Sequence, residues 1–586
     1  MQYKRLVDLY QKIEGTTKRL EKTYFVSEFL KTTDVDDIRK IILLLQGKVF
    51  PPYDPRTLGV ASRMVIKAIS KSFGITPLKI ENEWKRTGDL GDTAEYLAGK
   101  KRQSTLFSQQ LTVNKVFNNL VKMASMEGSG AVDRKVGLVS ELLTSASPVE
   151  ARYIIRTVLE DLRVGIGEGV LRDSIVWAFF DDTINVNYDD EKKAINPENR
   201  ETLNMYVEKV QEAYNVLNDF SQVAELAKTS GLTGLKSVSV EAGKPLKVML
   251  YPKAQGIAGA FDTVGRPAAI EYKYDGFRLQ IHKKAGKITL FTRRLEDVTP
   301  QFPEVVDYVS EHVKGKEFIL DAEAVGYDPN TKKYLAFQKI SQRIKRKYNI
   351  AEMAKDFPVE VNIFDIIDHE GMNLLKEPFK ERRKIIENIV KPSLFKIRPA
   401  QQIVTADDKE AEDFYKESLA AGEEGVMFKN LEGIYKPGSR VGYGVKVKPV
   451  MESLDLVIVG AEWGEGKRSG WFTSFTLACY DKDKGEFLEI GKVGTGIKEL
   501  EGSGLTFEQL TEMLKPLVKQ EKGRSVRFTP QLVIEINYEE IQKSPTYSSG
   551  YALRFPRVIR VREDRAPDEC SDIELIESFY STQRSR

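Results

Sequence analysis

The spacing of apolar residues changes from helical to alternating near residue 236 of the 586-residue chain. Before that point apolar residues recur every three or four positions, the spacing that buries one face of an α-helix. A stretch rich in Gly and Ser at 229–246, "TSGLTGLKSVSVEAGKPL", then interrupts the pattern. Beyond it Phe277, Leu279 and Ile281 alternate with polar residues, as in a half-buried β-strand. Because a chain this long also exceeds what one hydrophobic core supports, several domains are expected.

The pattern predicts three domains of different class. Residues 1–236 are predicted to form an all-helical domain, and residues 237–448 an α+β domain that includes a hairpin through "FRLQIHKKAGKITLFTRR". Residues 449–586 contain short strand-like runs separated by Gly-rich turns, which predicts a small β-barrel. Two helical stripes in the first domain are Val35, Ile38, Ile41, Ile42, Leu45 and Val132, Val136, Val139, Leu143.

Residue usage excludes several classes of protein. The only cysteines are Cys479 and Cys570, so a disulfide framework and a four-cysteine zinc site are excluded, and a reducing cytosol is indicated. The net charge of +3 is small, so an anionic partner must be met by local basic patches. The strongest apolar run, "IILLL" at 41–45, is too short to span a bilayer. We therefore expect an intracellular protein with no membrane segment, located in the cytoplasm.

The stretch "EYKYDGFRLQIH" at 271–282 places Lys273 in a strand-like run, directly before an Asp-Gly corner. A lysine with an ordinary pKa of about 10.4 is almost fully protonated at pH 7, so it becomes a nucleophile only where its surroundings lower that pKa. K-x-D-G alone is a weak signal, and a solvated strand lysine is the simpler interpretation. Further motifs follow in a fixed order: "FTRRLEDVT", "LDAEAVGYD", "VNIFDIID", "EEGVMFK", "GVKVKP" and "RFPRVIRVREDR".

In this order the motifs resemble those of the covalent nucleotidyltransferase superfamily of ligases and capping enzymes. They are most similar to archaeal-type ATP-dependent DNA ligases, and are also similar to the eukaryotic replicative DNA ligase. Three stretches resemble that family outside the shared motifs: "GDLGD" at 88–92, "LRVGIGEG" at 162–169 and "EEIQKSPTYSSGYALRFPR" at 539–557. The resemblance covers nearly the whole chain. It implies a helical DNA-binding domain, an adenylation domain and a C-terminal OB-fold.

The resemblance also implies a reaction. Lys273 attacks the α-phosphorus of ATP and carries AMP as a phosphoramidate, a role that a permanently protonated arginine could not fill. AMP then passes to the 5′-phosphate of a nick in duplex DNA, and the 3′-hydroxyl displaces it, as in replication, repair and recombination. Asp275 orients the Lys273 loop or assists a metal ion. The family's OB-fold helps orient the leaving pyrophosphate and then clasps DNA.

Other matched positions imply binding roles. Glu271 accepts a hydrogen bond from the adenine amino group, and Phe364 stacks on the purine, although a core phenylalanine is the simpler alternative. Glu323 and Glu424 are matched to carboxylates that hold Mg²⁺, with Mn²⁺ as the alternative ion. Without the resemblance, the simpler interpretation of Glu323 is a solvated acidic residue on a strand, and that of Glu424 is an ion-pair partner. The positions matched to groups that hold ATP, AMP or the nick phosphate are Arg278, Arg293, Arg440, Lys446, Lys448, Arg562 and Asp564.

Three segments have two interpretations each, and a fourth contains one residue whose role stays open. Glycines in "GDLGD" and "LRVGIGEG" either bring backbone N–H groups to DNA phosphates or cap helices. "KKRQSTLFSQQ", with Gln103, Leu106 and Phe107, either docks a sliding clamp, as the resemblance implies, or packs back on its own domain. "RVREDR" has Arg565 where the family usually has lysine, which leaves a specific role for that residue open.

Two rival functions remain within reach of these motifs. An mRNA guanylyltransferase would share the central motifs but has no use for a helical domain of this size. A non-catalytic clamp for nicks or DNA ends would keep the fold without needing Lys273, Glu323 and Glu424 together. An NAD⁺-dependent ligase is disfavoured because its zinc cysteines are absent. The expectation is a monomeric, nucleoid-associated enzyme acting on nicked duplex DNA.

Overall fold

The computed structural model describes residues 1–583 except 101–109, 190, 193, 198, 336, 345, 347, 439–441, 450, 465–467, 469 and 500–503. Two compact units divide the chain. One contains Met1–Pro252, Gly276–Ala400 and Asn430–Tyr443, and the other contains Lys253–Asp275, Gln401–Lys429 and Gly444–Arg586. Residues 237–448, predicted above as one domain, therefore contribute to both units. Among the described residues, no helix combines the length and hydropathy that crossing a bilayer requires.

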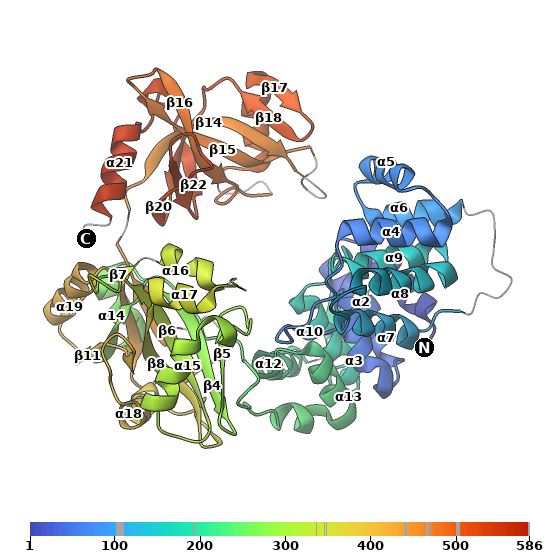
Figure 1. Cartoon of the computed structure of the whole chain (residues 1–586), viewed down its shortest axis with the longest axis horizontal. Coiled ribbons are helices and arrows are strands. Elements are labelled where there is room, and N and C mark those ends of the chain that lie inside the picture. The colour runs from blue at the N-terminus through green and yellow to red at the C-terminus, as the bar shows by residue number, and fades with distance from the viewer. Residues whose placement is uncertain are drawn as a thin grey trace. The chain divides into compact units, whose positions relative to one another are not determined.

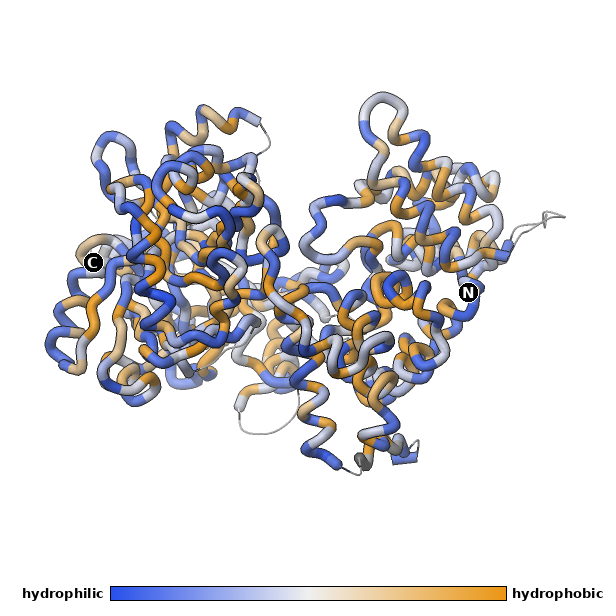
Figure 2. The backbone as a smooth tube through the Cα atoms, turned by 90° about the horizontal axis from the view of Figure 1, so that it is seen from below, coloured by the Kyte–Doolittle hydropathy of each residue, from blue (hydrophilic) through white to orange (hydrophobic). Residues whose placement is uncertain are grey.

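The N-terminal part of the first unit is helical, with one short hairpin (Figure 1). Along these helices hydrophobic and hydrophilic residues alternate at short intervals, as Figure 2 shows. The elements are α1 (Tyr3–Glu14), α2 (Arg19–Lys31), α3 (Val35–Leu45), α4 (Ser62–Phe73), α5 (Pro77–Thr87), α6 (Leu90–Gly99), α7 (Val113–Ala124), α8 (Ala131–Ser145), α9 (Pro148–Val158), α10 (Glu168–Phe179), α11 (Asp181–Ile184), β1 (Val186–Asp189), β2 (Ala194–Pro197), α12 (Arg200–Leu217) and α13 (Phe220–Lys236).

The predicted helical stripes are confirmed except at their first residues. Ile38, Ile41, Ile42 and Leu45 of α3 are buried in the helical core, as are Val136, Val139 and Leu143 of α8. Val35 and Val132 were expected in the core but are 40% and 47% exposed. Each lies in the first turn of its helix, where the periodic pattern extends past the edge of the packed surface.

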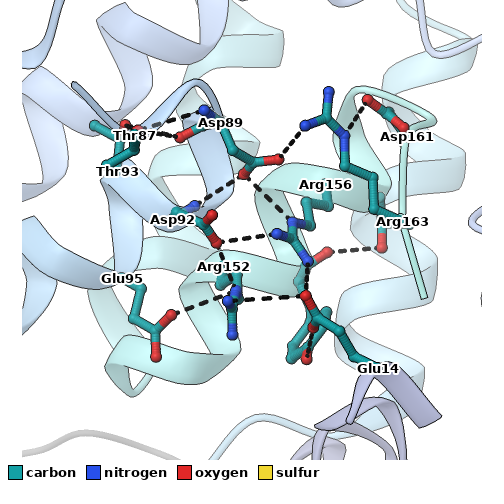
Figure 3. Close-up of polar contacts among 12 residues, drawn as sticks. Glu14, Thr87, Asp89, Asp92, Thr93, Glu95, Arg152, Arg156, Asp161 and Arg163 are labelled. Carbon is teal, nitrogen blue, oxygen red and sulfur yellow. Dashed lines mark hydrogen bonds and ion pairs between the residues drawn. The ribbon is translucent and has the colours of Figure 1, made fainter. Parts of the chain in front are cut away.

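A network of acidic and basic side chains joins α1, α6, α9 and the loop after α9 (Figure 3). Asp89 caps α6, accepting a hydrogen bond from the Asp92 amide at 2.9 Å. The buried Arg156 side chain contacts Glu14 at 3.1 Å, Asp89 at 3.3 Å and Asp92 at 3.0 Å. Arg163, in the loop, reaches the other Asp89 oxygen at 3.0 Å. These contacts join segments that are far apart in sequence, so they fix how the helices pack.

This network gives a packing reason for one glycine of "GDLGD", and a helix end gives a capping reason for the other. A Cβ on Gly91 would lie 2.8 Å from the Arg152 carbonyl oxygen and 2.8 Å from Asp89, so glycine is required for α6 to approach α9. Gly88, with φ of 71°, ends α5 in the left-handed conformation that favours glycine. Both glycines thus have a packing or capping reason, and a contact of this segment with DNA phosphates stays a prediction.

The network predicts a pH-dependent loss of stability. Burial alone would raise the pKa of Asp89, but the Asp92 amide and Arg156 hold it below its ordinary value, and Tyr153 and Arg156 do the same for Glu14. Carboxyls with depressed pKa stabilise the fold above their unfolded pKa of about 4, and this stabilisation is lost as pH falls through the folded values. As the pH is lowered past about 4, we expect the melting temperature to decrease, and to decrease less steeply in Asp89→Asn. Calorimetry from pH 7 to pH 2.5 measures this, and equal slopes for both proteins would contradict it.

The rest of the first unit is built on a seven-stranded sheet whose main path is β10-β8-β6-β4-β5. The predicted hairpin is confirmed as β4 and β5, joined through Ala285 and Gly286, whose φ values of 48° and 79° suit a two-residue turn. Helices α15, α16 and α18 pack against the sheet. The elements are β4 (Phe277–Lys284), β5 (Lys287–Thr292), α15 (Pro303–His312), β6 (Phe318–Tyr327), β7 (Tyr334–Leu335), α16 (Phe337–Ile344), α17 (Ile350–Asp356), β8 (Val359–His369), β9 (Met372–Asn373), α18 (Phe379–Ile389) and β10 (Ile397–Pro399).

The second unit contains a four-stranded sheet and a β-rich C-terminal part. The four-stranded sheet has the order β11-β3-β12-β13 and is formed by segments from three places in the chain. Its elements are α14 (Gly256–Val264), β3 (Ala268–Lys273), β11 (Gln402–Thr405), α19 (Asp408–Ala420), β12 (Gly425–Asn430) and β13 (Gly444–Val447). We call it the small sheet.

The β-rich part agrees with the predicted small barrel in its strand content. The long strand β14 pairs with β15 on one side and with both β18 and β19 on the other, which curves the sheet around a core of its own. The elements are β14 (Leu454–Trp463), β15 (Phe472–Asp481), β16 (Glu486–Val493), α20 (Phe507–Leu514), β17 (Val518–Lys522), β18 (Ser525–Phe528), β19 (Val533–Asn537), β20 (Glu540–Lys543), β21 (Tyr551–Arg554), β22 (Arg557–Val561) and α21 (Ile573–Thr582).

Candidate active site

Lys273 ends β3, which is one of the two inner strands of the small sheet and lies next to β12. The residues before it, Ala268 to Ile270, are completely buried, so the strand is anchored while its last side chain is 20% exposed. Its ammonium forms an ion pair with Glu424, and the Glu424 amide donates to the Lys273 carbonyl at 2.9 Å. Lys273 is therefore neither a solvated surface lysine nor a core residue. It is a partly buried amine held from two directions by one residue.

The two acidic residues directly before β12 contact Lys273 and the turn that follows it. Glu423 accepts the Asp275 amide at 2.8 Å through its side chain, and Glu424 holds Lys273. The Asp-Gly corner after the lysine is thus fixed by a segment about 150 positions further along the chain. For Asp275 the structure shows this orienting contact through its backbone, and a direct role in catalysis stays a prediction.

Three lysines surround Glu424. Lys448 contacts Glu424 at 3.2 Å and Glu539 at 3.3 Å. Burial alone would raise the pKa of Glu424, but Lys273 and Lys448 lower it to about 2. Burial, Lys448 and Lys273 together lower the pKa of Lys446. The cluster carries an excess of positive charge, which suits a polyanionic ligand such as a triphosphate.

Glu424 was predicted either to hold a metal ion or to be an ion-pair partner, and in this structure it is an ion-pair partner of Lys273 and Lys448. Its carboxylate is ionised and offers the hard oxygen ligands that Mg²⁺ prefers, so the donor chemistry fits the predicted metal. Within the described part of the chain, no three His, Cys, Asp or Glu side chains gather as a ready-made metal cage.

A second polar group lies on the same face of β3, two residues before Lys273. Glu271 is 1% exposed and forms an ion pair of 2.6 Å with Lys429, itself 2% exposed. Gln402, opposite Glu271 in the register of β11 and β3, donates to its other oxygen at 2.8 Å. Side chains two positions apart on a strand share a face, so Glu271 and Lys273 face the same side of the small sheet.

Arg278, Glu323 and Phe364 belong to the larger sheet of the first unit. The Arg278 guanidinium binds Asp321 at 3.1 Å and donates to the Met249 carbonyl at 2.8 Å. Its carbon Cζ lies 5.1 Å from the centre of the Phe364 ring. Glu323 is opposite Arg278 in the register of β4 and β6. Burial would lower the pKa of Arg278, but Asp321 keeps it above the ordinary value. A role for Arg278 in binding phosphates stays a prediction.

The remaining predicted residues lie in several places. Arg293 is exposed in the turn after β5. In the β-rich part Arg562 pairs with Asp455 at 2.8 Å and with Asp564 at 2.7 Å, and Arg565 reaches Asp455 at 3.2 Å. Arg565 thus shares the acidic partner of Arg562. Arg440 and the proposed clamp-docking residues Gln103, Leu106 and Phe107 lie outside the described residues.

Sequence reasoning missed several partners. The motifs assign no role to Lys429, nor to Glu423, although Glu423 directly precedes Glu424. No local signal marks Gln402, Asp321 or Asp455, because each becomes a partner only through sheet register or long-range packing. Gln402 could have been found as a partner of Glu271 only by pairing β11 with β3.

Comparison with known proteins covers the whole chain. Residues 2–176 match the family model for the DNA ligase N terminus, 248–448 the ATP dependent DNA ligase domain, and 468–565 the ATP dependent DNA ligase C terminal region. The chain is 48% identical over 586 residues to a DNA ligase of Nanoarchaeum equitans, covering 100% of this chain and 99% of that one. It is 41% identical over 583 residues to a DNA ligase of Thermococcus fumicolans, again covering 100% and 99%.

One solved structure supports the fold alone. The structure described as "Pmar-Lig_PreS3" aligns with a TM-score of 0.54 at 17% identity, covering 95% of this chain and 99% of that chain. The archaeal relatives, by contrast, match at high identity from end to end.

Proposed function

This chain belongs to the ATP-dependent DNA ligase family, and we propose that it seals 5′-phosphate/3′-hydroxyl nicks in duplex DNA with Lys273 as the AMP-carrying nucleophile. The observation that carries the assignment of Lys273 is its place at the end of an anchored strand, held by Glu424 and accompanied by Lys446 and Lys448. A DNA-binding protein without this chemistry has no need for a fixed, partly buried amine among cations.

The first step joins Lys273 to AMP. Nζ loses one proton to solvent, its lone pair forms a bond to the α-phosphorus of ATP, and the bond from that phosphorus to the bridging oxygen breaks. A second proton then passes from Nζ to solvent, which leaves the neutral phosphoramidate nitrogen. Pyrophosphate leaves with the electron pair. In this proposal Lys446 and Lys448 bind phosphate oxygens, and binding by Lys448 would compete with its contact to Glu424. Phosphoryl transfer depends on such charge neutralisation and positioning more than on proton shuttling.

Carboxylates of the chain fit a divalent ion as the second participant. Glu424 would hold Mg²⁺, or Mn²⁺ in its place, and the ion would supply charge neutralisation at the phosphates, while metal binding by Glu323 on the larger sheet stays a separate prediction. Because Glu424 already contacts Lys273, an ion bound at Glu424 would compete with that ion pair.

Two further steps complete the proposed reaction. The 5′-phosphate of the nick attacks the phosphorus of lysyl-AMP and releases the Lys273 amine, and the 3′-hydroxyl then displaces AMP from the DNA-adenylate. Binding to the DNA backbone is expected to be independent of sequence and to weaken with salt. The proposal includes a monomeric enzyme at the nucleoid in the cytoplasm, acting in replication, repair and recombination, with the segment around Phe107 docking a sliding clamp.

Incubation with labelled nucleotide and Mg²⁺ tests this function. The full-length protein is expected to gain one acid-labile AMP from ATP and to seal a 5′-phosphorylated nick. Gain of GMP from GTP instead would support a guanylyltransferase, and no label at all would support the non-catalytic clamp. Either of these outcomes overturns the proposal.

A further inference from the structure

Glu423 is a buried acidic residue to which the proposed reaction gives no role. It is almost completely buried, at 5% exposure, and its side chain accepts a hydrogen bond of 2.8 Å from the Asp275 amide. Burying a polar side chain destabilises the fold unless the group is hydrogen-bonded, and a smaller apolar residue would avoid that cost. The contact reaches the backbone two residues after Lys273, so its effect concerns the segment that carries the nucleophile.

The segment that carries Glu423 is itself fixed. Helix α19 ends at Ala420, and Gly422, with φ of 88°, takes the left-handed conformation through which the chain turns into β12. The Glu423 amide donates to the Ser418 carbonyl at 3.1 Å. The Glu423 side chain therefore extends from the end of a helix, and it holds the Asp275 amide against a fixed support.

Helix α19 is also joined to β3, the strand that ends with Lys273. The Tyr272 hydroxyl donates to Glu417 of α19 at 2.8 Å, and the centre of the Phe414 ring of the same helix lies 4.8 Å from the centre of the Tyr272 ring. Tyr272 and Lys273 are neighbours on a strand, so their side chains point to opposite faces of the small sheet. One face of β3 is thus anchored on α19 while the other face carries the nucleophile.

Two contacts hold the backbone on either side of Tyr274, directly after the nucleophile. The Lys273 carbonyl accepts a hydrogen bond from the Glu424 amide at 2.9 Å, and the Asp275 amide donates to the Glu423 side chain at 2.8 Å. The first contact is made between backbone atoms, so a change of side chain does not remove it. The second is made by the Glu423 side chain, so a substitution there removes this contact alone.

We infer that Glu423 is a positioning residue for Lys273, which fixes the backbone after the lysine so that the amine is held in line with the α-phosphorus. This inference rests on the proposed function. Lys273 takes part in the formation of lysyl-AMP and in the transfer of AMP to the 5′-phosphate, but not in the final joining. Attack requires the reacting atoms to be about 3–3.5 Å apart and aligned, and a misplacement of about 1 Å costs about 100-fold in rate. Loss of the Glu423 contact is therefore expected to slow the first two steps and to spare the third.

Glu423→Met and Glu423→Gln separate the hydrogen bond from the packing. Methionine fills a similar volume without a carboxyl oxygen, whereas glutamine keeps one oxygen that can accept from the Asp275 amide. In single-turnover reactions of the full-length protein with ATP and Mg²⁺, the limiting rate of lysyl-AMP formation is expected to fall about 30- to 100-fold in Glu423→Met. The ATP concentration that gives half of this rate should change by less than about 3-fold, since ATP binding itself is not the affected step. Glu423→Gln should stay within about 3-fold of the wild-type rate.

Two nicked substrates isolate the later steps. A nick with a 3′-dideoxy end stops the reaction at the DNA-adenylate, so it measures AMP transfer from protein that has first been fully loaded with AMP, and Glu423→Met is expected to be slow here too. A pre-adenylated nick measures joining alone, and both variants should seal it at the wild-type rate, which also shows that they are folded. Glu412→Met is the matched control, since Glu412 is an exposed residue of α19 paired with Lys416, and it should keep all three rates.

Wild-type formation of lysyl-AMP by Glu423→Met overturns the inference, and so does an equal loss in Glu423→Met and Glu423→Gln. A loss of the same size in joining of the pre-adenylated nick also overturns it, because that result indicates general damage to the fold. Glu423→Ala removes the same acceptor with a smaller side chain and must show the same pattern as Glu423→Met. If the wild-type protein takes no AMP from ATP, the proposed function fails instead, which separates the two claims.

Discussion

Lys273→Ala is expected to abolish sealing of a 5′-phosphorylated nick, with a loss of at least about 10⁴-fold relative to the wild-type protein, because no covalent AMP carrier remains. Lys446 and Lys448 do not substitute for Lys273. Lys446 lies on β13 and Lys448 directly follows that strand, so neither is at the end of β3, and Lys448 is paired with Glu424 and Glu539. A gel assay of a labelled nicked duplex with ATP and Mg²⁺ measures this directly.

A pre-adenylated nick provides the control for this prediction. That substrate already contains AMP on the 5′-phosphate, so the variant is expected to join it, which shows that the protein is folded and still binds DNA. Lys380→Ala, at an exposed position of the first unit, should seal both substrates as the wild type does. Ordinary turnover of the 5′-phosphorylated nick by Lys273→Ala would contradict the assignment.

Arg382→Met is expected to lower the free energy of unfolding by about 3–5 kcal/mol, because it leaves a buried carboxylate without its cation. Arg382 and Asp365 are each 1% exposed, and they share two hydrogen bonds of 2.7 and 3.1 Å between α18 and β8. Arg382 also donates to the Gly433 carbonyl at 3.1 Å. Urea denaturation at pH 7 gives the free energy.

The double variant Arg382→Met/Asp365→Asn separates the lost charge from the lost packing. Since it leaves no buried charge, it should recover part of the stability that the single variant loses. A single variant as stable as the wild type would show that this pair does not hold α18 to the sheet.

The sequence predicted the classes of the elements well, because their periods are local. The alternation in Phe277, Leu279 and Ile281 identified β4, and the hairpin to β5 followed from the turn residues. Periodicity also predicted that Val35 and Val132 are buried, which is wrong, because periodicity does not show where a neighbouring helix ends. Registers between distant strands, such as Gln402 opposite Glu271, have no local signal.

The candidate site was predicted as a set of residues but not as a set of contacts. Its ion pairs join residues far apart in the chain, such as Glu424 with Lys273, and Arg562 with Asp455. Motif order predicts which charged residues belong to the site, but only packing decides which charge neutralises which. Arg278 shows the difference, because its balancing partner Asp321 lies on another strand.

The account depends most directly on a covalent bond at one side chain. Peptide mapping by mass spectrometry, after the full-length protein is incubated with ATP and Mg²⁺ and kept at neutral to alkaline pH, locates any nucleotide adduct. The predicted result is one AMP on the peptide that contains Lys273, and its disappearance when a nicked duplex is added. An adduct on a different residue, or an unmodified Lys273 in a preparation that seals nicks, would contradict the account.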